Sequence, residues 1–246
     1  MHRARALAQL SALLRDQCPR KPDWPAVLAM AGEHLIVAQL RPHLPDDHRT
    51  PADVRAYVEE MSARTRARNL RLNETLSHAL DAMNARDLEP VLLKGCAQWA
   101  EAPAGLSDRV VADIDLFVEP DAAGLAIEAL ENAGFDLLED HRDAHDHQVV
   151  VLGRKGDVGA IDLHFRLPGA ALIDGLAELC LEARTVRLDG ARARTLTPEL
   201  QIFILAMHDQ IHDAHLWRGG FDLRRLIDTA RLARSNLQWD RTSALE

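Results

Sequence analysis

The sequence predicts an α+β protein in which a β-sheet core lies between N- and C-terminal helical regions. Short apolar, strand-like runs occur at 90–94, 113–118 and 160–167. By contrast, apolar residues before residue 86 and after residue 197 recur at helical spacing. We therefore expect three parts, with a helical region at 1–88, a sheet-containing core at 89–192 and a second helical region at 193–246.

The N-terminal part is predicted to hold helices at Ala4–Leu14, at Ala26–Leu40 and from about 52 to 85. Proline-containing breaks at 18–25 and 41–51 separate them. The last of these helices carries several arginines: Arg55, Arg64, Arg66, Arg68 and Arg71. We interpret them as a solvated charged face, the alternative being a basic wall that faces a phosphate-bearing ligand.

Turn chemistry divides the core. Gly95 ends the first strand and precedes a short helix at 97–100, and a helix from Asp121 to Ala133 is expected to stop at Gly134. Further strands are predicted at three places, the first two forming a hairpin through 153–157: Val149–Leu152, Ala160–Leu167 and Thr185–Leu188. From Pro198 to about Ala233 the pattern is helical again.

Composition limits the functional classes. The 246 residues are 47% hydrophobic and 27% charged, as in ordinary globular proteins. A formal net charge of −9 argues against broad binding to nucleic acid or anionic membranes. The three cysteines form no metal-binding pattern, and neither a signal peptide nor a membrane-spanning run is recognisable, so we expect a cytoplasmic protein.

Two carboxylates in one apolar strand give the strongest functional signal. Asp113 and Asp115 are two residues apart, so in a strand they project from the same face, whereas Ile114 and Leu116 point into the core. Neighbouring carboxylates repel each other unless a cation lies between them. The pair therefore predicts a divalent metal, with magnesium and a phosphate ligand the best match.

Two further features extend this site. Gly95 lies between a strand and a helix, where the absence of a Cβ and the free N–H groups of a helix start favour phosphate. Asp162 occupies a third strand between Ile161 and Leu163. If these strands pair, three carboxylates converge beside a phosphate-binding turn, an arrangement suited to two-metal phosphoryl or nucleotidyl transfer.

These motifs together resemble the uncharacterised bacterial nucleotidyltransferases of the DNA polymerase β-like superfamily. The resemblance covers roughly 90–168 and is carried by four segments: Leu93-Lys94-Gly95, Arg109, Asp113-Ile114-Asp115-Leu116-Phe117-Val118 and Ile161-Asp162-Leu163-His164-Phe165. It implies a mixed β-sheet nucleotidyltransferase core with flanking helices. It also implies that Asp113, Asp115 and Asp162 are catalytic and bind magnesium, Asp162 helping to deprotonate the acceptor hydroxyl.

The resemblance implies a nucleotide-binding set of Lys94, Gly95, Cys96 and Arg109. Related proteins commonly have Ser or Gly where this chain has Cys96, and a thiol is a weaker hydrogen-bond donor than a hydroxyl. Lys94 can alternatively be a solvated cation at a strand end. Arg109 can alternatively pair with Asp108 or with the carboxylate cluster.

Several histidines accompany this pattern. His164 shares a strand face with Asp162 and is expected either to orient a neighbour by a hydrogen bond or to act as a catalytic residue itself. His208 and His212, four residues apart on a helix, are expected to pack and hydrogen-bond around the site rather than to bind zinc. His141, His145 and His147 are interpreted as a solvated loop near the site.

The resulting hypothesis is an enzyme that transfers a nucleoside monophosphate from an NTP, with ATP expected first, to a hydroxyl or phosphate acceptor, releasing pyrophosphate. Two Mg²⁺ ions, replaceable by Mn²⁺, are the expected cofactors. The expected acceptor is a small molecule or a protein, with tRNA less favoured and no membrane involved. The alternatives are a catalytically inactive nucleotide- or protein-binding module and a metal-dependent phosphohydrolase.

Overall fold

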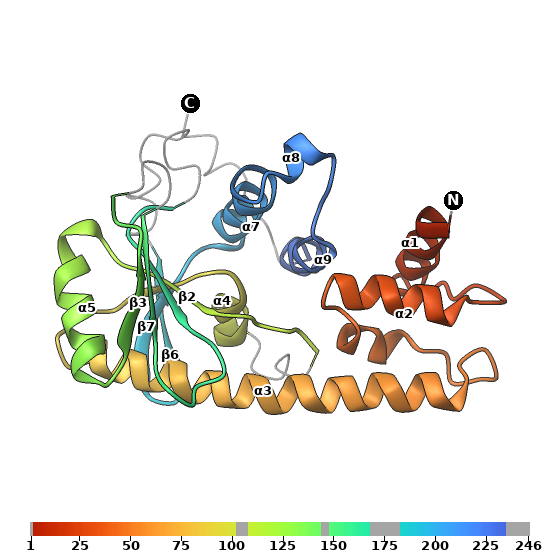
Figure 1. Cartoon of the computed structure of the whole chain (residues 1–246), viewed down its shortest axis with the longest axis horizontal. Coiled ribbons are helices and arrows are strands. Elements are labelled where there is room, and N and C mark those ends of the chain that lie inside the picture. Colours follow the sequence, from red (N-terminus) through yellow and green to blue (C-terminus); the bar gives the residue numbers. More distant parts are fainter. Residues whose placement is uncertain (1, 102–107, 144–147, 168–182, 235–246) are drawn as a thin grey trace. The chain divides into compact units, whose positions relative to one another are not determined.

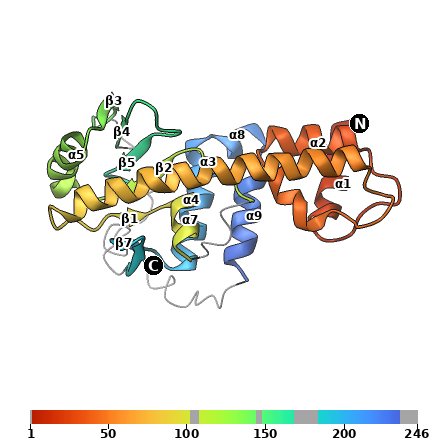
Figure 2. The same ribbon diagram turned by 90° about the horizontal axis from the view of Figure 1, so that it is seen from below.

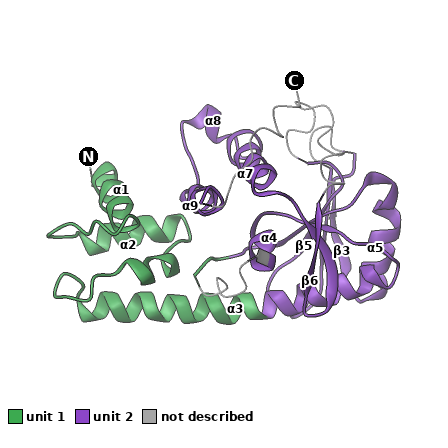
Figure 3. Cartoon of the chain, turned by 180° about the vertical axis from the view of Figure 1, so that it is seen from behind, with its two compact units in different colours: residues 1–70, 104–110 green, residues 71–103, 111–246 purple. Residues whose placement is uncertain are grey.

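A computed structural model describes residues 2–101, 108–143, 148–167 and 183–234. The chain divides into two compact units, which are coloured separately in Figure 3. The first comprises residues 1–70 and 104–110, and the second comprises 71–103 and 111–246. The boundary falls inside the long helix α3 (Ala52–Asn84), which contributes residues to both units. The predicted division at residues 88 and 192 stays a prediction.

The first unit is helical, as the spacing of its apolar residues predicts. It contains α1 (His2–Leu13), α2 (Trp24–Glu33), the 3₁₀ helix η1 (Ala38–His43) and the first half of α3. The helix predicted at 26–40 is thus two shorter elements. The carbonyl oxygens of Ala31 and Gly32 accept from the amides of Ile36 and Leu35, and Leu35 has φ of 55°, so the first helix ends there.

The second unit is built on a seven-stranded mixed sheet with the order β3-β4-β5-β2-β1-β7-β6. Figure 1 draws its strands as arrows. Its strands are β1 (Val91–Leu92), β2 (Ile114–Phe117), β3 (Asp136–Asp140), β4 (Val149–Gly153), β5 (Ile161–His164), β6 (Arg184–Leu188) and β7 (Ala191–Thr195). β2 runs parallel to β5 and antiparallel to β1, and the predicted hairpin of β4 and β5 is present. The predicted α+β class with a mixed sheet and flanking helices is confirmed.

Helices flank this sheet. They are α4 (Lys94–Glu101), η3 (Pro120–Ala122), α5 (Ala123–Asn132), α7 (Pro198–Met207), the π-helical turn η5 (His208–His212), α8 (His215–Arg218) and α9 (Leu223–Leu232). Figure 2 shows α4, α7 and α9 gathered on one side of the strands. None of the helices within the described ranges has both the length and the apolarity needed to cross a membrane.

The core that joins sheet and helices is aliphatic, as the low aromatic content requires. One cluster packs side chains of β1, β2 and α7 together, among them Val91, Phe117 and Ile204. All four residues of β2 are buried, including Asp115. The sequence therefore places a carboxylate in a fully buried strand of the unit, where burial needs a compensating charge or metal.

Two expectations about this unit were wrong. The continuous helix predicted at 198–233 is interrupted, because a π-turn follows α7 and Ala214 adopts a left-handed φ of 58°. Strands β3 and β7 were missed. β3 is exposed along its whole length, and β7 (Ala-Arg-Ala-Arg-Thr) alternates small and basic residues, so neither has the apolar texture that identified the other strands.

Candidate active site

The central feature of the second unit is the register between β2 and β5. Asp115 pairs with Asp162, and two residues further on Phe117 pairs with His164. Because alternate residues of a strand share a face, Asp162 and His164 lie on the same side of the sheet. Asp115, Asp162 and His164 each offer a ligand atom, and these atoms lie within 4.8 Å of one another. The structure therefore brings together carboxylates that are 47 residues apart in the chain.

The negative charge of Asp115 is neutralised by hydrogen bonds from neighbouring side chains. Its Oδ1 accepts from Lys94 Nζ at 2.6 Å and from His164 Nε2 at 3.2 Å. Burial alone raises the pKa of the Asp115 carboxyl, but the Lys94 ammonium and the His164 hydrogen bond outweigh burial and hold it well below its usual range. Asp115 is therefore ionised at neutral pH, and His164 must carry its proton on Nε2 to donate to it.

Lys94 reaches Asp115 from a strained turn. The amide of Leu93 donates to the Asp115 carbonyl oxygen at 3.0 Å, which extends the β1–β2 pairing to the start of α4. Lys94 itself has φ of 48°, a left-handed conformation that costs roughly 1 kcal/mol for a non-glycine residue. The turn thus directs an ammonium group at the carboxylates and places Gly95 in the first turn of α4.

The surroundings of Asp162 shift the pKa of its carboxyl in the opposite direction. Burial, together with the negative charges of Asp115 and Asp113, raises the pKa of its carboxyl to about 7. Asp113 lies directly before β2 rather than within it and is partly exposed. The predicted trio consequently consists of one carboxylate paired with a cation, one that can be protonated near neutral pH and one directly before the start of β2.

Cys96 has a structural contact. It is buried, and its Sγ lies 4.0 Å from the carbonyl oxygen of Asp113. Its amide donates to the Leu93 carbonyl oxygen at 3.1 Å. The side chain at this position therefore packs beneath the segment that leads into β2, and its role in holding a triphosphate stays a prediction.

The histidines at the end of α7 belong to the same electrostatic neighbourhood. Burial lowers the pKa of His208 far below its usual range, and the positive charges of Lys94 and Arg225 lower it further. Partial burial also lowers the pKa of His212, despite the opposing charge of Asp213. Both imidazoles are thus neutral at pH 7. Burial is likewise the main cause of the lowered pKa of His164.

A comparison with protein families decides the identity of this fold. The family described as "Uncharacterised nucleotidyltransferase" matches residues 20–245. The chain belongs to this nucleotidyltransferase family. A comparison with curated proteins found no match.

Two solved structures of the antibiotic-resistance factor ANT(2'')-Ia are similar to this nucleotidyltransferase. One, a solution structure, has a TM-score of 0.49 and 20% identity, covering 70% of this chain and 88% of that chain. The other, a crystal structure of ANT(2'')-Ia in complex with adenylyl-2''-tobramycin, has a TM-score of 0.48 and 20% identity, covering 70% and 93% of the two chains.

Arg109, predicted to bind nucleotide, belongs to the first unit of the nucleotidyltransferase. It is buried; its guanidinium donates to the Val110 carbonyl oxygen at 3.4 Å, and its own carbonyl oxygen accepts from Asn69 Nδ2 at 2.7 Å. Its role towards a nucleotide stays a prediction. The nearby Asp108 accepts from Ser62 at 3.4 Å.

Of the three histidines predicted to form a solvated loop, only His141 lies within the described residues. His141 is exposed and pairs with Glu139 at 3.0 Å, whereas His145 and His147 lie outside the described residues. Two residues of the C-terminal segment were not selected from the sequence, namely Asp213 and Arg225, which pair with each other. The signal for Asp213 was the dense run of Asp and His at 208–215, but helical spacing alone does not bring residues 208 and 213 together, and no pattern pointed to Arg225.

Proposed function

We propose that this nucleotidyltransferase moves a nucleoside monophosphate from an NTP, ATP being the first to test, to a hydroxyl or phosphate acceptor in a magnesium-dependent reaction. The observation that carries the proposal is the parallel register that sets Asp115 opposite Asp162, with Lys94 bonded to Asp115. Converging carboxylates beside a cation at a strand–helix turn form a site for an anionic, metal-bound substrate. Asp113, Asp115 and Asp162 are the proposed catalytic residues.

The donor chemistry of the site fits magnesium. Carboxylate oxygens are the ligands that Mg²⁺ prefers, and burial, followed by the negative charges of Asp115 and Asp113, raises the pKa of the Asp162 carboxyl, an effect that a bound cation would oppose. The three carboxylates would hold the metal, and His164 would orient Asp115 through its hydrogen bond. Bound there, magnesium neutralises phosphate charge and polarises the phosphorus under attack. Mn²⁺ has similar ligand preferences and is expected to substitute.

The start of α4 is the proposed triphosphate site. Lys94 supplies an ammonium group next to the carboxylates, and Gly95 lets a ligand approach the backbone closely. The N-terminus of a helix also favours anions. Because Lys94 is already paired with Asp115, it compensates that charge before substrate binds and can turn to phosphate when another cation takes its place.

Asp162 is the proposed acceptor of the substrate's proton. Without bound metal, its pKa of about 7 lets this carboxylate take a proton at neutral pH more readily than an ordinary aspartate. In the reaction the acceptor oxygen forms a bond to the α-phosphorus while its proton passes to an Asp162 oxygen. The bond between the α-phosphorus and the bridging oxygen breaks, and the electron pair leaves with pyrophosphate.

The acceptor class is proposed from charge. With a formal net charge of −9, the chain favours a small molecule or a protein over a long polyanion. The arginines of α3 do not change this preference, because several are paired within their own unit. Arg55, for example, contacts Asp46 at 3.2 Å, and Arg64 contacts Glu60 at 2.6 Å.

The first experiment measures thermal stability with each of the four NTPs, with and without magnesium. A ligand at 100 times its Kd adds about 2.7 kcal/mol to the free energy of unfolding. We expect a magnesium-dependent rise in Tm with at least one NTP for the wild type and little or none for Asp162→Asn. Transfer of α-phosphate label to candidate acceptors, with pyrophosphate release, then measures the reaction.

Asp136→Asn is the matched control, since Asp136 is an exposed carboxylate on β3 of the same sheet. It should respond to NTP and magnesium as the wild type does. Phosphate release without any acceptor would instead favour a phosphohydrolase. Nucleotide binding without product for every acceptor class would favour an inactive binding module.

A further inference from the structure

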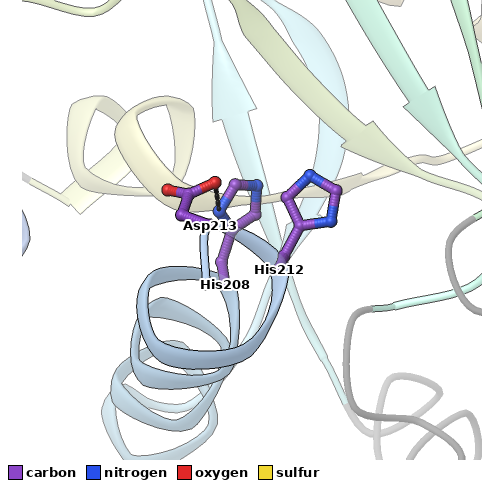
Figure 4. Close-up of side chains that lie close together, drawn as sticks. All are labelled: His208, His212 and Asp213. Carbon is purple, nitrogen blue, oxygen red and sulfur yellow. Dashed lines mark ion pairs between the residues drawn. The ribbon is translucent and has the colours of Figure 1, made fainter. Parts of the chain in front are cut away.

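Three further metal-capable side chains, none of them among the proposed catalytic carboxylates, lie at the end of α7. They are His208, His212 and Asp213, and their ligand atoms lie within 4.8 Å of one another. Figure 4 shows both imidazole rings and the Asp213 carboxylate on the same side of the helix end. All three belong to one six-residue segment, so the local backbone fixes their mutual placement.

The π-turn is what brings them together. The Asp213 amide donates to the His208 carbonyl oxygen at 2.9 Å, a bond between residues five apart. In an α-helix residue i+4 lies over residue i, and residue i+5 is rotated away from it. In the wider π-turn residues i+4 and i+5, here His212 and Asp213, both lie near residue i, here His208. Ala214 then ends the turn in a left-handed conformation with φ of 58°. Such strain is found most often at functional sites.

The distance between the side chains of His208 and Asp213 fits two ligands of one metal ion better than a direct hydrogen bond. His208 Nδ1 and Asp213 Oδ1 are 3.6 Å apart, too far for a hydrogen bond, which needs about 2.7–3.2 Å. Two ligands bound to one tetrahedral zinc at about 2.1 Å each are about 3.4 Å apart. The rings of His208 and His212 are also neighbours, with centroids 4.6 Å apart and planes tilted by 59°.

Neighbouring side chains hold Asp213 in place. Arg225 pairs with its other oxygen, Oδ2, and also contacts buried Asp209 at 3.3 Å. A hydrogen-bonded partner behind a ligating carboxylate is the usual support of a metal site. Arg225 thus forms ion pairs with both carboxylates. His208 is buried and His212 is exposed, which leaves one side of the group open to solvent.

We propose that His208, His212 and Asp213 bind one divalent transition metal ion of the Zn²⁺ or Co²⁺ type, with an open position for water or a ligand. Two imidazoles and one carboxylate make a three-ligand set typical of zinc sites of the open kind. Magnesium prefers oxygen ligands alone, so this site and the carboxylate site differ in the metal they select. The proposal is independent of the proposed transfer reaction.

The test is a Co²⁺ titration of the full chain after chelator treatment, followed by visible absorption. We expect one equivalent to give the intense bands of four- or five-coordinate cobalt with nitrogen ligands, and one equivalent of Zn²⁺ to abolish them. His212→Ala should weaken this binding at least tenfold. Because His212 is exposed, this variant is expected to fold, which its Tm checks.

Two variants make the result specific. His215→Ala removes the histidine of a neighbouring group, in which His215 contacts Asp209 at 2.8 Å, and should leave the bands intact. Asp162→Asn should also keep them, even though it is expected to reduce nucleotidyl transfer by about 10²-fold or more. The proposal is overturned if wild-type protein gives no such bands, or if they persist in His212→Ala. It is equally overturned if they vanish in His215→Ala or Asp162→Asn.

Discussion

Asp115 and Asp162 lie opposite each other across β2 and β5, yet their surroundings move their pKa values in opposite directions. Lys94 and His164 hold Asp115 ionised, whereas burial and the charges of Asp115 and Asp113 raise the pKa of Asp162 to about 7. Two acids whose pKa values are moved apart in this way can take different roles, one as a permanent anion and one as a proton acceptor. This difference gives the first two predictions.

Asp162→Asn should reduce transfer activity by about 10²-fold or more while raising the stability of the metal-free protein at pH 8. Activity falls because the proton acceptor and a metal ligand are lost, and general-base catalysis contributes roughly 10²–10⁴-fold. Stability rises because the amide removes a charge that burial and two carboxylates disfavour. Steady-state transfer rates and urea unfolding measure the two effects. A variant that is both inactive and less stable would contradict the electrostatic account.

The contribution of Asp162 to the stability of the metal-free wild type should fall as pH rises from about 4 to about 7. A carboxyl whose pKa is raised on folding binds more protons in the folded state over this range, so its contribution to the free energy of unfolding decreases with pH and levels off above about 7. Buried His208, whose pKa is lowered, contributes with the opposite sign, so the Asp162 contribution is measured against a variant that keeps this histidine. A rise in pKa from 3.8 to about 7 corresponds to roughly 4 kcal/mol at about 1.4 kcal/mol per pKa unit, which is the upper limit expected for the contribution of Asp162. Chemical unfolding at each pH should show that Asp162→Asn gains stability relative to the wild type as pH rises through this range, and addition of magnesium should reduce this difference at pH 8. Equal profiles for the two proteins would exclude this role for Asp162.

The fold class and the convergence of Asp115 with Asp162 were predictable because they depend on local patterns. Apolar strands with single acids define a face, and parallel pairing of two such strands places those acids together. Two features were not predictable. The Lys94–Asp115 pair depends on a left-handed turn at a non-glycine residue, which sequence preferences disfavour. The approach of Asp213 to His208 depends on a π-turn, for which helical spacing gives the wrong neighbours.

Lys94→Met should destabilise the protein by about 3 kcal/mol at neutral pH. The side chains of Lys94 and Asp115 are 13% and 10% exposed, so removing the ammonium leaves a nearly buried carboxylate without its closest counter-charge. Adding Asp115→Asn to this variant should recover part of the loss, since the stranded charge is then removed. Denaturant unfolding of the two single variants and the double variant measures the coupling energy. Additive effects would mean that the 2.6 Å contact between Lys94 and Asp115 contributes little in solution.

Ala214→Gly should stabilise the protein by about 1 kcal/mol without weakening cobalt binding. Ala214 has φ of 58°, a conformation that an L-residue with a Cβ adopts at a cost and that glycine adopts freely. The greater freedom of glycine in the unfolded chain offsets part of this gain. Ala133→Gly is a suitable comparison, because Ala133 also follows a helix but has φ of −87°, so glycine there relieves no strain and should destabilise. Thermal unfolding of both variants decides the point. If both substitutions destabilise equally, the chain does not hold Ala214 in the left-handed conformation, and the turn that brings Asp213 to His208 loses its support.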